Sequence, residues 1–144
     1  MLDEAARALD AAVELRVQAA KEQFEALKKA ERERLVAEAE LREPQHQAGL
    51  FKRRYDEIWT ESCPACKCRA FISGEQTGED ISEERDEDAI WEVVDREFVG
   101  EEFRCPTCDL TLVGSDEIDA AGVNYIHEDQ HEREMEYEPD YGND

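Results

Sequence analysis

Two Cys-Pro-x-Cys pairs limit what this chain can fold into more than any other feature of its sequence. They are Cys63-Pro64-Ala65-Cys66 and Cys105-Pro106-Thr107-Cys108, and residues 67–104 lie between them. Two residues between cysteines let one tight turn present both sulfurs to one metal ion, and a second such turn completes the tetrahedral sulfur shell that Zn2+ prefers. The spacing therefore predicts one structural zinc, bound by Cys63, Cys66, Cys105 and Cys108, with no position open to substrate.

The sequence offers two alternatives for these cysteines. A redox-active dithiol needs a helix N-terminus behind its thiolate, whereas strand-like residues follow both pairs here. A Cys2His2 shell would leave the first pair without a metal, and its gap from cysteine to histidine is longer than that of a compact finger. Its ligands would be Cys105, Cys108, His127 and His131. The fifth cysteine, Cys68, is predicted to be a small buried residue that points away from the ligands.

The surroundings of the second pair resemble the second half of the rubredoxin-like zinc ribbons that are attached to many bacterial proteins. The similar residues are 103–114, Asp116-Glu117 and Ala120-Ala121-Gly122, and residues 62–69 match the first knuckle. The resemblance spans residues 60–126 and implies a small three- or four-stranded sheet around one zinc. Such knuckles often carry glycine directly after the second cysteine, where this chain has Lys67 and Asp109. Aspartate adopts a positive φ at modest cost, and lysine does so less easily.

The negative charge of the chain lies almost entirely in its second part. Of 39 acids and 17 bases, residues 1–61 hold 14 acids and 11 bases, which leaves 25 acids and six bases for residues 62–144. A ribbon of this charge repels phosphates instead of releasing counterions from them, so nucleic acid is an unfavoured partner. The exception is Lys52-Arg53-Arg54, a basic cluster that is either a solvated helix face or a phosphate contact.

Composition also limits the function. No phosphate-binding loop, nucleophile elbow or carboxylate pair in apolar sequence is present, and a chain of 144 residues with 40% hydrophobic residues has little material for an enzyme cleft. These observations favour a noncatalytic zinc-binding adaptor that docks a protein partner, expected to be basic, through a helical arm and an acidic ribbon. The alternatives are a nucleic-acid accessory protein that uses Lys52, Arg53 and Arg54, or an acidic mimic of nucleic acid.

Residues 1–61 are predicted to form a helical arm. Good helix formers fill residues 2–42, and Leu2, Val13, Phe24 and Leu35 recur at the hendecad spacing that is typical of a nearly straight helix. Pro44 ends this helix, and a second helix is expected over residues 46–60, with an apolar stripe. The pair forms a helical hairpin or coiled coil, and the long stripe predicts packing on this chain or self-association.

Residues 62–126 read as a small antiparallel zinc ribbon, which makes the fold class α+β. Strands are expected at 69–73, 90–94, 102–104 and 110–113, and a short helix at 115–121. The acid-rich residues 75–88, next to Gly74 and Gly78, are predicted to be a loop insertion. An acidic tail, residues 127–144, is expected to be flexible.

Neither a membrane nor secretion is expected from the sequence. No apolar run approaches the ~18 residues that span a bilayer, and the first residues lack the pattern of a signal peptide. Clustered cysteines free to bind metal fit a reducing compartment, so the protein is predicted to be cytoplasmic.

Overall fold

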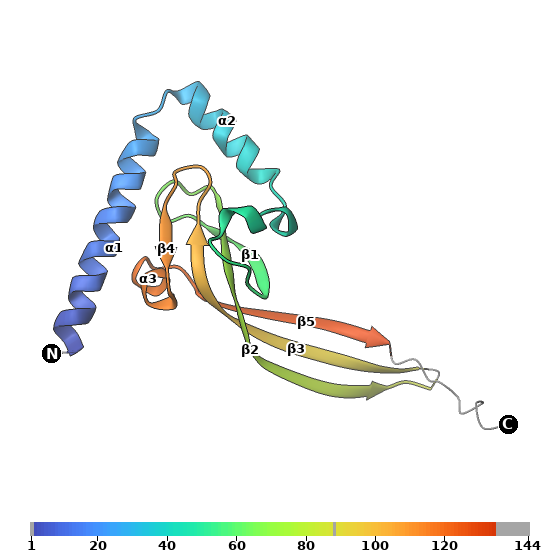
Figure 1. Ribbon diagram of the computed structural model, residues 1–144. Coiled ribbons are helices and arrows are strands. Elements are labelled where there is room, and N and C mark those ends of the chain that lie inside the picture. The colour runs from blue at the N-terminus through green and yellow to red at the C-terminus, as the bar shows by residue number, and fades with distance from the viewer. Residues whose placement is uncertain (1, 88, 135–144) are drawn as a thin grey trace.

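In a computed structural model that describes residues 2–87 and 89–134, the chain combines helices with a five-stranded antiparallel sheet (Figure 1). The expected α+β class is confirmed. The strands are β1 (Glu57–Ser62), β2 (Arg69–Arg85), β3 (Ile90–Arg104), β4 (Thr111–Val113) and β5 (Ile126–Glu134). The helices are α1 (Leu2–Glu25), α2 (Lys29–Glu40) and α3 (Ser115–Ala120), the last at the predicted place.

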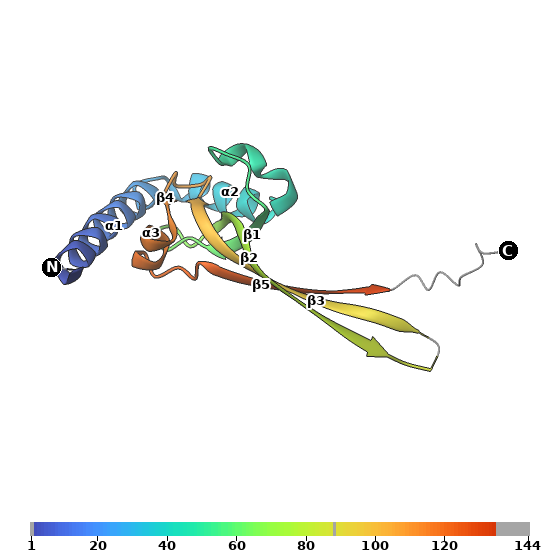
Figure 2. The same cartoon turned by 60° about the horizontal axis from the view of Figure 1, so that its bottom comes forward.

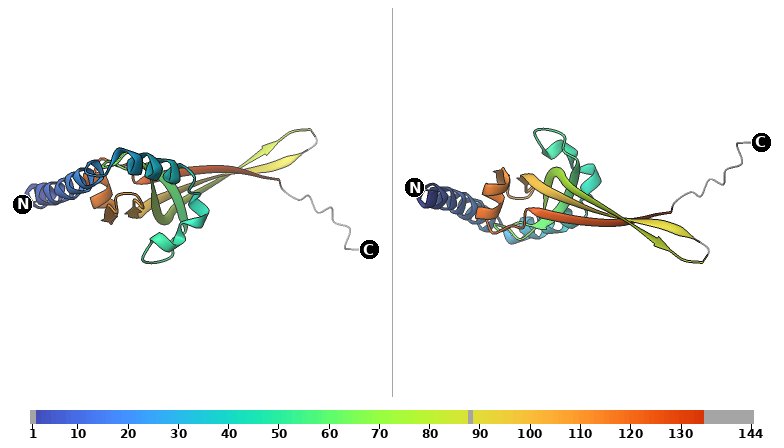
Figure 3. Two further views of the ribbon diagram at one scale, coloured as in Figure 1. Left: turned by 90° about the horizontal axis from the view of Figure 1, so that it is seen from above. Right: turned by 90° about the horizontal axis from the view of Figure 1, so that it is seen from below.

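The strand order is β1-β2-β3-β4, and β5 pairs with β3 as well. Because β2 pairs with β3 along its length, β4 and β5 share the other edge of β3: β4 lies beside residues 102–104 and β5 beside residues 91–99. The sheet therefore has two parts. We call residues 76–85 of β2 with their partners in β3 and β5 the arm; this part of the sheet is distinct from the helical arm expected over residues 1–61. The remainder of the sheet, with the cysteine pairs, is the ribbon. Figures 2 and 3 show the arm twisting away from the helices.

The core lies in the ribbon. Its fully buried side chains include Phe71, Ile72, Phe103, Leu112 and Ile118, which come from β2, β3, β4 and α3. Gly122, with φ of 77°, follows α3 and turns the chain toward β5. The short strands and one short helix thus surround a small apolar interior from several sides.

The prediction of one helix over residues 2–42 is wrong, because α1 and α2 are separate helices that form an inverted V around the ribbon (Figure 1). Lys28 is extended, with φ of −65° and ψ of 148°. The sequence holds no glycine or proline at this point, so the break follows from packing. By turning back, α2 buries Ala39, and the Arg69 guanidinium donates hydrogen bonds to the carbonyl oxygens of Glu40 at 3.4 Å and Arg42 at 3.0 Å.

The apolar stripe of α1 is covered by its own chain. Val13 is 0% exposed and Ala20 is buried, and Leu9, Val17 and Phe24 pack against the same core. These residues recur at intervals of three and four, which places them on one face of the helix. The self-association expected of this stripe stays a prediction.

The second expected helix, residues 46–60, is also wrong. The chain makes two short 3-10 turns, Pro44–His46 and Ala48–Leu50, and then enters β1 at Glu57. Gly49 weakens a helix here, and the β-branched Ile58 and Thr60 suit a strand. Pairing of β1 with residues 69–74 of β2 brings Trp59 into the core.

The prediction of a loop over residues 75–88 is wrong, because β2 continues through these acidic residues as far as Arg85. Register shifts between Ser73 and Gly74, and between Gln76 and Gly78, mark two bulges. At Gly74 a Cβ atom would lie 2.0 Å from the carbonyl oxygen of Val99, so only glycine fits. The expected flexible tail, residues 127–144, likewise begins as strand β5; its residues 135–144 lie outside the described part of the chain.

Candidate metal centre

The two cysteine pairs form knuckles with the same backbone hydrogen bonds. In the first, the Cys63 N–H donates to the Cys68 carbonyl at 2.9 Å, and the Lys67 N–H donates to the Cys63 carbonyl at 3.0 Å. In the second, the Cys105 N–H donates to Leu110 at 3.0 Å, and the Asp109 N–H donates to Cys105 at 2.9 Å. One knuckle lies between β1 and β2 and the other between β3 and β4, so two neighbouring hairpins face one another.

This arrangement brings together the four predicted cysteines. Their sulfur atoms all lie within 4.8 Å of one another, at 3.6 Å between Cys63 and Cys108 and 3.5 Å between Cys66 and Cys105. A tetrahedral site with Zn–S bonds of ~2.3 Å has sulfurs ~3.8 Å apart. All four residues are buried free thiols, and the Ala65 N–H points to the Cys63 sulfur at 3.4 Å. Four buried sulfurs at these distances fit a tetrahedral metal ion.

Proximity changes the acidity of the four thiols. Hydrogen bonding with Cys105 lowers the pKa of Cys63, and hydrogen bonding with Cys108 lowers the pKa of Cys105. The pKa values of Cys66 and Cys108 are raised, and in each case the largest cause is the hydrogen bond that the thiol makes with Cys105. Metal ligation requires thiolates, so metal binding at this cluster would release protons.

No protein-family model, curated protein or solved structure matches this chain. The four-sulfur geometry therefore carries the interpretation of the site. It indicates a metal-binding cluster of the zinc-ribbon kind.

Each knuckle requires a left-handed residue after its second cysteine. Lys67 has φ of 65° and Asp109 has φ of 62°, at the positions where zinc ribbons often carry glycine. The chain therefore adopts the usual knuckle backbone without the usual residue. For a residue with a Cβ atom, this conformation costs ~1–2 kcal/mol.

We expect Lys67→Gly to raise the free energy of unfolding of the metal-loaded protein by ~0.5–1 kcal/mol. Relief of the left-handed strain exceeds the larger entropy that glycine gives the unfolded chain. Urea denaturation at fixed zinc concentration measures the change. Lys67→Ala is the matched control, because it removes the same long side chain but keeps the Cβ atom and should bring no gain. A Lys67→Gly protein less stable than wild type would contradict this account.

The remaining cysteine and the histidines lie outside the cluster. Cys68 is buried where the second knuckle has Leu110, and its sulfur approaches the Cys66 carbonyl at 3.8 Å, so it takes the apolar position expected of it. His127 stacks on Trp59 with ring centroids 4.9 Å apart, and His131 is exposed on β5. The Cys2His2 alternative is therefore wrong. Both knuckles lead into strands, as the argument against a redox dithiol assumed.

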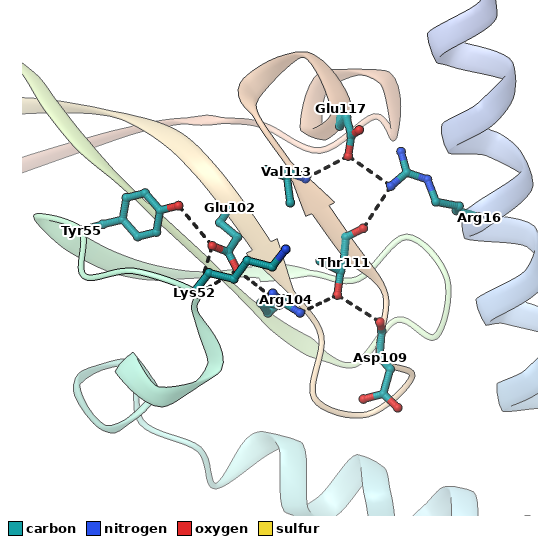
Figure 4. Close-up of polar contacts among 9 residues, drawn as sticks. All are labelled: Arg16, Lys52, Tyr55, Glu102, Arg104, Asp109, Thr111, Val113 and Glu117. Atoms are coloured by element: carbon teal, nitrogen blue, oxygen red, sulfur yellow. Dashed lines mark hydrogen bonds and ion pairs between the residues drawn. The ribbon is translucent and has the colours of Figure 1, made fainter.

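The buried ion pair of Glu102 and Arg104 beside the second knuckle was not predicted from the sequence (Figure 4). Glu102 is 1% exposed, and its carboxylate accepts a hydrogen bond from the Arg104 guanidinium at 2.7 Å. It also accepts hydrogen bonds from the Tyr55 hydroxyl at 3.1 Å and from the Lys52 N–H at 3.3 Å. The Arg104 guanidinium also donates a hydrogen bond to the Thr111 hydroxyl at 3.0 Å. A Glu-x-Arg pair on one face of a strand was the available signal, and the network fastens residues 52–55 to β3 and β4.

An arginine of α1 holds this helix against β4 and α3 (Figure 4). Arg16 lies 3.1 Å from the Glu117 carboxylate and donates to the Thr111 carbonyl at 3.4 Å. Burial raises the pKa of Glu117, but the hydrogen bonds from Arg16 and from the Val113 N–H outweigh it and lower the pKa overall. The helices and the metal centre are thus parts of one packed unit.

The basic cluster Lys52-Arg53-Arg54 lies in an irregular segment before β1, not on a helix. All three residues are exposed, and the Arg53 guanidinium pairs with Glu75 at 3.1 Å and lies 4.6 Å from the centre of the Tyr55 ring. Part of its charge is therefore neutralised within the chain. Among the described residues, moreover, no helix has the length and hydropathy that crossing a membrane requires.

Proposed function

We propose that this protein is a noncatalytic adaptor in which one Zn2+, bound by Cys63, Cys66, Cys105 and Cys108, fastens the ribbon and lets the arm bind a basic protein. The observation that carries the proposal is the cluster of four buried cysteine sulfurs within 4.8 Å of one another. As thiolates around one Zn2+ they would fill a tetrahedral site and leave no position for water or substrate. When bound there, zinc supplies a cross-link between two hairpins. The other residues then determine what the molecule binds.

The charges of the arm support a basic partner. The strand register places six carboxylates on one face, which we call the acidic face: Asp80, Glu84, Asp95, Glu97, Glu128 and Glu132. These carboxylates lie in the four cross-strand rows that begin at residues 78, 80, 82 and 84 of β2, and no residue of these rows is a lysine, arginine or histidine. Within the part of the chain that the structure describes, the side-chain hydrogen bonds to the carboxylates of Asp95 and Glu97 come from uncharged residues, Gln130 at 2.8 Å and Thr77 at 3.4 Å respectively.

The opposite face, which we call the ion-paired face, is different. Its arginines pair with its carboxylates: Arg96 with Asp129, Arg133 with Glu92, and Arg85 with Glu83. A protein that used its acidity only for solubility would have no reason to place its arginines on one face of a sheet. An unneutralised carboxylate surface attracts cations and steers a basic protein toward it.

Immobilised zinc-loaded protein is expected to retain basic proteins from a lysate of its own source, and 0.5 M salt is expected to release them, because salt screens exposed charges. Treatment of the lysate with nuclease should change nothing. A variant with Asp80→Asn, Asp95→Asn and Glu97→Gln should retain at least fivefold less. The matched control changes Glu79, Glu83 and Glu92 to Gln, the same charge on the other face, and should retain most of the protein.

The nucleic-acid alternative makes the opposite prediction in the same experiment. Retained material that nuclease removes, and that disappears when Lys52, Arg53 and Arg54 are changed to Ala, would transfer the binding role to that segment. Equal losses in the two triple variants would show that overall charge, and not the acidic face, binds the partner.

A further inference from the structure

The outer edge of β2 is open along the arm. β1 pairs with β2 only as far as Gly74, and within the described residues no other strand lies on that side of residues 75–85. In an antiparallel strand every second residue directs its N–H and C=O away from the existing partner. Figures 2 and 3 show β2 at the border of the arm, away from the helices. A row of unpaired hydrogen-bonding groups is therefore available to another chain.

The open edge of β2 begins after Gln76, whose N–H is bound by a side chain that precedes β1. The Gln76 N–H donates to the carboxylate of Asp56 at 2.9 Å, and this hydrogen bond lowers the pKa of Asp56. The side chain thus takes the place that the next residue of a longer β1 would have taken. From residue 76 to residue 85 every side chain of β2 is exposed, so neither helices nor loops of the described chain cover the edge.

Charge determines which kind of strand can add to this edge. Residues 75–85 contain five acids and one arginine, so a second copy of the same edge would meet like charges at close range. A strand that carries lysine or arginine meets opposite charges instead. Among the described strands the outer edge of β5 is also open, but residues 126–134 include Arg133 and two histidines and are less negative.

We infer that the outer edge of β2, residues 77–85, binds an extended basic segment of a partner protein as an added strand, with lysine or arginine at every second position. On one side of the added strand, these basic residues face Asp80, Glu84 and the other carboxylates of the acidic face. On the other side, the alternate residues meet Glu79, Ile81, Glu83 and Arg85. Ile81 is 50% exposed and Arg85 pairs with Glu83, so this side is less negative and suits neutral or apolar residues. The inference rests on the proposed adaptor function and specifies how its partner is recognised.

The test uses the zinc-loaded full chain and a labelled synthetic peptide that matches residues 77–85 in length and in which lysine and valine alternate. Fluorescence anisotropy should show saturable binding that weakens at least tenfold for a peptide of the same composition with all lysines first. N-methylation then tests the backbone. Methylation of all lysine nitrogens and methylation of all valine nitrogens block opposite edges of the peptide, so one series should lose binding at least tenfold and the other should stay within threefold of the parent.

Two further measurements place the peptide. Amide hydrogen exchange should slow for residues 77–85 of β2 when it binds. Asp80→Asn with Asp95→Asn should weaken binding more than Glu79→Gln with Glu83→Gln, which removes the same charge from the ion-paired face.

Equal binding of both methylated peptides would overturn strand addition and leave the basic-partner proposal standing. Binding of no peptide would overturn strand addition too, and if basic proteins were also not retained, the adaptor proposal would fail with it. Dimerisation of the free chain with protection of the same amides would assign the edge to a second copy and overturn the inference.

Discussion

Loss of the metal is expected to unfold the ribbon and release both helices from it. Metal ligation contributes ~10–16 kcal/mol of apparent binding free energy in small zinc modules, more than the stability of most domains of this size. Because α1 and α2 pack against the ribbon, and an isolated helix of 12 residues such as α2 is marginal in water, the helical circular dichroism should fall as well. Zinc analysis, chemical-shift dispersion and circular dichroism after chelation, or in Cys105→Ser, measure these changes.

Cys68→Ser is the matched control for this experiment. Its sulfur is buried close to the first knuckle but lies outside the four-sulfur cluster, so the variant should keep one equivalent of zinc per chain. Loss of zinc in Cys68→Ser together with retention of zinc in Cys105→Ser would contradict the ligand assignment. A metal-free chain with the dispersion of the loaded chain would contradict a structural role for the metal.

The cysteine cluster was predictable from the sequence because knuckle spacing is a local property. The composition of the long segment between the pairs favours a loop, yet two paired strands fill it. β2 leaves the first knuckle and β3 returns to the second, so the register that pairs Phe71 with Arg104 places the knuckles side by side. The sequence therefore predicted that the four cysteines come together and that strands follow and precede the knuckles, but it did not predict that β2 continues through the acidic residues as far as Arg85.

The errors have a common physical cause. Gly74 and Gly78 are typical of loop ends, whereas here they belong to bulges in a continuous strand. At Gly74 the close approach of the β3 backbone excludes a side chain. Residues 46–60 have an apolar spacing that fits a helix, but a partner strand determined their structure. The break at Lys28 has no local signal, because it is stabilised by the contacts that α2 makes with the ribbon.

Glu102→Ala is expected to lower the free energy of unfolding by ~3 kcal/mol. Removal of one partner of a buried ion pair costs ~3–5 kcal/mol because the other charge stays without compensation. The lower end applies here, since the Arg104 side chain is 24% exposed and can be hydrated in part. The Tyr55 hydroxyl and the Lys52 N–H also lose their acceptor. Urea denaturation at saturating zinc measures the loss.

The neighbouring Glu101→Ala is the control, because its side chain is more exposed than that of Glu102 and its carbonyl, which accepts the Gly114 N–H at 2.7 Å, remains. It should change stability by no more than ~0.5 kcal/mol. Tyr55→Phe should cost ~1 kcal/mol, the net value of one hydrogen bond, and Glu102→Gln should fall between Tyr55→Phe and Glu102→Ala, because it keeps an acceptor oxygen but loses the charge. Equal costs for Glu101→Ala and Glu102→Ala would mean that the pair contributes only surface charge. A larger cost at Glu102 with unchanged zinc content would establish that the chain holds residues 52–55 against the ribbon independently of the metal.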